Sequence, residues 1–151
     1  MSTIHQASAV AIEIAARVAT ITIANGFNTD IGLNVLRGRR RIDDHQVPCV
    51  VVVEGLDTPT AAPGRMATAE ISQSYMLIAY HACHPDHPND KAHELIKDLK
   101  RAIFKDGVTL NSMVPRVDYK GRDIGPRGDG VGIVCASIEI AVKFVEDLTN
   151  P

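Results

Sequence analysis

The densest group of side chains with chemical potential lies between residues 81 and 93. His81, Cys83, His84 and His87 fall within seven residues, and His93 lies one turn into the helix expected next. Imidazole and thiolate are preferred zinc ligands, so this group permits a small metal site and metal-dependent catalysis. No second ligand pair of the C-x-x-C or H-x₃-H type accompanies it, and the H-E-x-x-H and zinc-deaminase signatures are absent. We interpret the group as a polar strand-to-helix connection, with a metal site as the alternative.

Motifs for nucleophilic or phosphate chemistry are missing. The chain contains no G-x-S-x-G and no C-x-x-C. The glycine-rich segment 125–130 lacks the Lys-Ser/Thr of a phosphate-binding loop, and its Arg127-Gly128-Asp129 is most simply a hairpin turn. The sequence therefore predicts neither an enzyme nor a bound cofactor.

A second candidate is a run of arginines. Arg37, Arg39, Arg40 and Arg41 place four guanidinium groups in five residues, followed by two aspartates at 43–44. Guanidinium groups favour carboxylate or phosphate partners, which indicates contact with an acidic protein surface or with nucleic acid. The alternative is a solvated, partly neutralised loop. The formal net charge of −2 argues against a DNA binder that is basic throughout.

Length and composition predict one soluble globular domain that spans residues 1–151. Of the 151 residues, 45% are hydrophobic and 23% are charged, which suits a packed core. No segment is apolar enough to cross a membrane, and the first ten residues do not resemble a signal peptide. The three cysteines, Cys49, Cys83 and Cys135, are too sparse for a disulfide framework and are expected to be small buried hydrophobes in a reducing cytosol.

Hydrophobic periodicity predicts the elements that must position these residues. A helix is expected over 4–21, ended by Asn25-Gly26, and a second one after an N-cap at Asn89 or Asp90. Strands are expected over the following ranges: 28–36, 49–53, 66–82, 116–122 and 131–145. The order α-β-β-β-α-β-β predicts an α+β fold, with a largely antiparallel sheet of about five strands and two helices packed on one face.

Alternation along the strands predicts which residues face the helices. In 66–82, Ile71, Tyr75 and Leu77 share one side, opposite a more polar side. In the last strand, the apolar side is Val134, Ala136, Ile138, Ile140, Val142 and Phe144. This last strand is long and carries few charges, so we expect it to contact another subunit, as exposed sheet edges do. Proline and glycine predict loops at 57–64 and 125–130.

Several blocks of the chain, in this order, resemble the tail terminator (tail completion) proteins of long-tailed bacteriophages. The run from Asn25 to Arg39, NGFNTDIGLNVLRGR, is similar to the N-terminal block of that family. Pro48 to Glu54 resembles its short apolar strand, and Pro88 to Phe104 its second helix. Val117 to Arg122 and the last strand, up to Leu148, resemble its closing hairpin.

The resemblance implies a structural virion protein without catalytic residues or cofactor. Such proteins form a homo-oligomeric ring, expected to be a hexamer, that stops growth of the tail tube and joins it to the head connector or stopper. Viral DNA passes through the ring without specific binding. The implied location is the tail–neck junction of the virion, after assembly in the host cytoplasm. Another neck or head-completion protein is the nearest alternative, before a metal-dependent enzyme or a nucleic-acid-binding module.

Because the family has no sharp interface motif, charge and exposure must indicate the contact residues. A head-to-tail ring needs two different complementary surfaces on each subunit. The candidates are Arg37, Arg39, Arg40, Arg41, Arg122, Arg127 and Asp129. We expect the arginine run to face acidic groups of a neighbour or of the tube, since a densely basic channel would hold DNA tightly. The segments 56–65 and 124–130 are expected to be loops that become ordered on docking.

Overall fold

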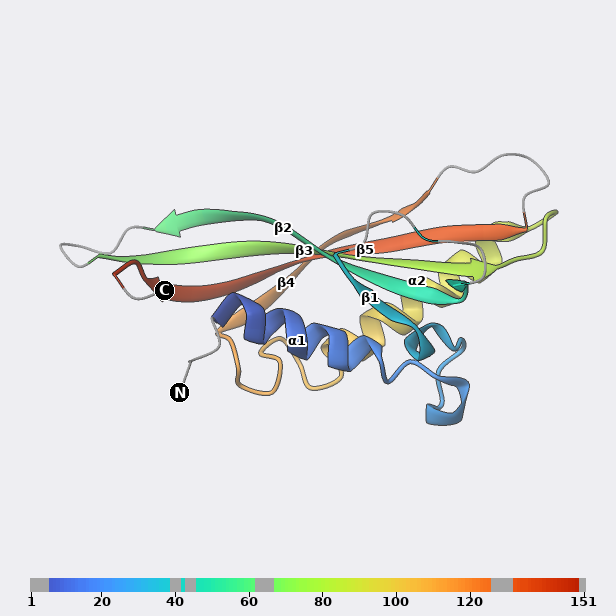
Figure 1. Ribbon diagram of the computed structural model, residues 1–151, viewed down its shortest axis with the longest axis horizontal. Coiled ribbons are helices and arrows are strands. Elements are labelled where there is room, and N and C mark those ends of the chain that lie inside the picture. The colour runs from blue at the N-terminus through green and yellow to red at the C-terminus, as the bar shows by residue number, and fades with distance from the viewer. Residues whose placement is uncertain (1–5, 39–41, 43–45, 62–66, 126–131, 150–151) are drawn as a thin grey trace.

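The computed structural model describes residues 6–38, 42, 46–61, 67–125 and 132–149. It contains the helices α1 (Gln6–Val18) and α2 (Pro88–Phe104). The strands are β1 (Val35–Arg37), β2 (Cys49–Ala61), β3 (Thr68–Ala82), β4 (Arg116–Ile124) and β5 (Ile133–Asp147). Both helices lie on the same side of one twisted sheet (Figure 1). The predicted α+β class and element order are confirmed.

The strand order in the sheet is β1-β2-β3-β5-β4. β1 runs parallel to β2, whereas all other neighbours are antiparallel. β3 and β5 pair along their whole length, from Thr68 opposite Asp147 to Ala82 opposite Ile133. The last strand is therefore an inner strand, and the expectation that it forms an exposed edge is wrong. The edges belong to β1 and β4, because β4 folds back onto β5 and occupies the outer position.

One expected loop and one expected strand differ from the structure. The predicted loop over 57–64 is wrong for its first part, since β2 continues to Ala61 and pairs Thr58 with Ser72. β1 pairs only with residues 50–52 of β2, so the later part of β2 is a sheet edge among the described residues. Proline is tolerated at such an edge because the N–H that it lacks would have no strand partner there. The expected strand over 28–36 instead contains a turn of 3₁₀ helix, Ile31–Leu33, and only its end belongs to β1.

The helix boundaries also differ from the expectation. α1 ends at Val18, and Gly26, with φ 87°, instead follows a short 3₁₀ turn, Ile23–Asn25. α2 begins at Pro88, so the N-cap position falls to His87 and not to the two residues that follow the proline. Proline at the first helical position lacks only an N–H that would have no partner in the helix.

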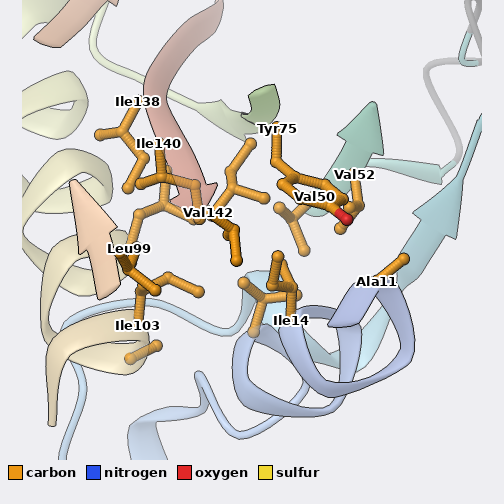
Figure 2. Close-up of a cluster of buried hydrophobic side chains, with 14 of the residues drawn as sticks. Ala11, Ile14, Val50, Val52, Tyr75, Leu99, Ile103, Ile138, Ile140 and Val142 are labelled. Atoms are coloured by element: carbon orange, nitrogen blue, oxygen red, sulfur yellow. The ribbon is translucent and has the colours of Figure 1, made fainter. Parts of the chain in front are cut away.

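The core lies between the helices and the sheet (Figure 2). The predicted apolar sides of β3 and β5 are buried there, and the alternation is confirmed. α1 contributes Ala11 and Ile14, and α2 contributes Leu99 and Ile103. Burial of one such aliphatic side chain stabilises the fold by about 1.5–3 kcal/mol. Within the described residues, no helix is long and apolar enough to span a bilayer.

A buried cation ties the two helices together. Arg17 is only 2% exposed. Its guanidinium donates to the carboxylate of Glu13 at 3.0 Å, to the carbonyl oxygen of Ile103 at 3.0 Å and to Asp106 at 3.2 Å. These contacts hold the end of α1 against the end of α2. The charge can be buried because each nitrogen of the guanidinium has an acceptor.

Tyr75 is expected to make the fold less stable at alkaline pH. Its ring is fully buried, and its hydroxyl donates to the carbonyl oxygen of Ala7 at 3.3 Å. Burial and, secondarily, the negative charge of Glu54 raise the pKa of the Tyr75 phenol well above its usual 10. Near pH 10–11 the Tyr75 phenol can then ionise only in the unfolded chain. The stability that the neutral phenol contributes to the fold is therefore complete below pH 10 and is lost as the pH rises further.

We therefore expect Tyr75→Phe to flatten the alkaline loss of stability. The phenol accounts for about 1.4 kcal/mol of the loss between pH 8 and pH 11. Urea unfolding of wild type and variant at both pH values measures the difference, and the comparison of slopes removes the constant cost of the lost hydrogen bond. Parallel pH profiles would contradict the assignment.

Candidate interface sites

A basic groove of about 740 Å³ lies between α2 and β4. It is lined by His93, Ile96, Lys97, Lys100, Arg101, Phe104, Tyr119 and Arg122. Among the described residues, the lining combines apolar and aromatic groups with four permanently charged cations and includes no carboxylate. Among the described residues, no carboxylate forms an ion pair with Lys97, Lys100 or Arg122. The groove is thus suited to an acidic ligand that also presents an apolar group.

Helical periodicity creates one wall of the groove. His93, Lys97, Lys100 and Phe104 follow one another at spacings of four, three and four residues, which places them along one stripe of α2. The stripe lies beside the buried face of the helix. The ammonium of Lys100 lies 4.6 Å from the centre of the Tyr119 ring, a cation–π contact that links α2 to β4.

A bulge in β4 creates the other wall. Tyr119 pairs with Ile140 and Arg122 with Ile138, so both side chains lie on the helix-facing side of the sheet. Residues three apart in a regular strand face opposite sides. The register shift between Tyr119 and Gly121, where Gly121 has φ 135°, adds one residue and turns Arg122 into the groove.

The opposite sheet edge carries an acidic and apolar segment, Glu54–Asp57. β1 pairs with β2 only as far as Val52, so the outer side of this segment has no strand partner among the described residues. Leu56 is 81% exposed, and its acidic neighbours Glu54 and Asp57 are also exposed. We call this segment the β2 edge.

The sheet face that the helices leave uncovered has its own hollow. It is lined mainly by Val53, Leu56, Met76, Lys120 and Glu139, with the serines of β3 between them. The hydroxyl of Ser74 donates to Glu139 at 2.9 Å. This face joins the β2 edge through Leu56, which belongs to both.

The structure places two of the seven predicted interface residues. Arg37 ends β1 and its guanidinium lies 3.9 Å from the carboxylate of Glu54, whereas Arg122 lines the basic groove. They lie on opposite edges of the sheet and are not brought together. The remaining candidates, Arg39, Arg40, Arg41, Arg127 and Asp129, lie outside the described residues.

Sequence reasoning did not single out the cations of α2 or Leu56. The spacing of Lys97, Lys100 and Arg101 beside the apolar stripe was a usable signal for a basic helix face. Leu56 gave no such signal, because it falls at the margin of a predicted loop and its exposure follows from its place on the sheet face that the helices leave uncovered.

The histidine and cysteine group lies around the connection from β3 to α2. The rings of His84 and His87 stack at 4.2 Å, and His87 Nδ1 lies 3.4 Å from the carboxylate of Asp90. Nowhere in the described part of the chain do three His, Cys, Asp or Glu side chains take up a metal-binding arrangement.

The expectation for the cysteines is only partly confirmed. Cys49 is buried, whereas Cys83 and Cys135 are half-buried, and all three are free thiols. Burial raises the pKa of the Cys49 and Cys135 thiols, which keeps them protonated near neutral pH.

Comparisons with protein families and with functionally characterised proteins identify no match to this chain.

Proposed function

We propose that this protein is the tail terminator of a long-tailed bacteriophage. In this role it forms a homo-oligomeric ring, expected to be a hexamer, on the tail tube, stops tube growth and joins the tail to the head connector or stopper. It acts by contact alone, with no catalytic step and no cofactor. Viral DNA passes through the ring without specific binding.

The observation that carries the proposal is a pair of unlike surfaces on opposite edges of one sheet. The basic groove lies beside β4, and the acidic, apolar β2 edge lies across the sheet from it. A ring of identical subunits joined head to tail requires two different, complementary surfaces on each subunit. The order of sequence blocks that resemble the tail terminator family adds the position in the virion.

Deletion of the gene from the phage genome tests the role directly. We expect electron microscopy to show tail tubes of excessive and variable length together with detached heads, because nothing stops tube polymerisation. Expression of the protein in trans is the control and should restore tailed particles. Free tails of normal length would instead indicate a neighbouring neck role, and normal infectious particles would contradict the proposal.

A further inference from the structure

We infer that the β2 edge of one copy docks into the basic groove of the next copy. The inference rests on the proposed ring and names the two surfaces that close it. The groove offers an apolar floor surrounded by cations, and the β2 edge offers one exposed leucine beside two exposed carboxylates. The occupant of the groove is thus a second copy of this chain.

The apolar parts of the two surfaces are complementary. Leu56 fits the floor formed by Ile96, Phe104 and Tyr119, because burial of an 81% exposed leucine against these side chains removes apolar area from water. Aromatic and aliphatic anchors in a desolvated pocket commonly dominate the energy of an interface.

The charges then define the orientation of this contact. Glu54 and Asp57 lie before and after the leucine along β2, and their pairing with Tyr75 and Gln73 places them on the helix-facing side of the strand, whereas Leu56 lies on the uncovered side. Lys97, Lys100 and Arg122 surround the floor of the groove. The groove cations have no carboxylate partner within the described chain, so the neighbour's carboxylates satisfy them without breaking an ion pair on that side. Opposite charges on two surfaces favour the correct encounter and disfavour contact between like surfaces.

The backbone allows the same contact. β4 is the last strand of the sheet, and the β2 edge begins where β1 stops, so each has one side without a strand partner among the described residues. Unpaired strand edges readily add a further strand. The β2 edge and the basic groove lie on opposite edges of the sheet, so two copies cannot engage all of their surfaces in a closed dimer. Each added copy leaves one free groove and one free edge, and the contact repeats until the ring closes.

Two charge-reversal variants test the inference. The groove variant is Lys97→Glu/Lys100→Glu, and the edge variant is Leu56→Ser/Asp57→Lys. All four positions are on the surface, so circular dichroism should show folded protein. The control is Lys91→Glu/Lys105→Glu, which changes the charge as much as the groove variant does, at positions outside the groove and outside the hollow that contains Leu56.

Sedimentation velocity from 10 µM to 1 mM provides the readout. Wild type and control are expected to associate beyond the dimer, whereas each surface variant remains monomeric, with a dissociation constant raised at least about 100-fold. In a mixture of the two, the groove variant keeps its intact β2 edge and the edge variant keeps its intact groove, so one contact between them remains possible. The mixture should therefore form a species of twice the 16.3 kDa chain mass and nothing larger.

Failure of the inference differs from failure of the proposed function. Wild type that stays monomeric at 1 mM, or variants that associate like wild type, would overturn the interface. A groove variant that loses duplex-DNA binding in fluorescence anisotropy but keeps its self-association would assign the groove to nucleic acid and would also overturn it. In each of these cases overlong tubes in the deletion phage would still support the terminator role.

Discussion

Asp98→Ala is expected to lower the free energy of unfolding by about 3 kcal/mol, because it removes the acceptor for a set of inward-facing donors. Asp98 lies on α2 and is fully buried. Its carboxylate accepts the Thr29 hydroxyl at 2.7 Å, the Asn28 side-chain amide at 3.0 Å and the Asn28 backbone N–H at 3.1 Å. Alanine leaves these donors without a partner, and the Thr29 hydroxyl is itself buried.

Urea unfolding followed by circular dichroism at neutral pH measures this loss. Asp90→Ala is the matched control, since it removes an exposed acid from the same helix and should cost less than about 1 kcal/mol. A double-mutant cycle with Thr29→Val should show strong coupling, because the threonine hydroxyl has little effect once its acceptor is gone. Equal effects of Asp98→Ala and Asp90→Ala would contradict the role assigned to the buried carboxylate.

Gly32→Ala is expected to cost about 3 kcal/mol for a different reason, the close approach of two backbone segments. An added Cβ at Gly32 would lie 2.6 Å from the carbonyl oxygens of Val18 and Ile21 and 2.8 Å from that of Ala19. These atoms belong to the end of α1 and the residues after it, so they cannot move aside as a flexible side chain could. The Gly32 N–H also donates to the Ile21 carbonyl at 2.8 Å.

The control for this variant is Gly132→Ala. Gly132 is exposed, and an added Cβ there meets no atom of the described residues within 4 Å, so the unfolding free energy of this variant should change by less than about 0.5 kcal/mol. Thermal unfolding of the two variants beside wild type gives the comparison. If Gly32→Ala melts with wild type, the two backbones are not in the close contact described.

Both variants act on the segment that leads into β1. Asp98 anchors its start at Asn28 and Thr29, and Gly32 fixes its middle against α1. This segment leads directly into β1, which pairs with β2 only as far as Val52. The sequence block that resembles the tail terminator family is therefore also the block that positions one of the two inferred contact surfaces.

The sequence alone determined which residues of the long strands are buried. Alternation in β3 and β5 predicts the helix-facing side, and the structure buries those residues, because side chains two apart in a strand point the same way. The apolar stripe of α2 likewise predicts its buried face. These signals lie within single elements and need no knowledge of the neighbours.

Only the tertiary structure decided where the surfaces are. The place of β5 inside the sheet, the extension of β2 through Pro59 and the turn of Arg122 into the groove by the β4 bulge all depend on strand pairing. Pairing joins residues far apart in the chain, so no local pattern of hydrophobicity or turn residues specifies which strand becomes an edge. For the same reason, Leu56 could be recognised as an exposed contact residue only after the uncovered face of the sheet was known.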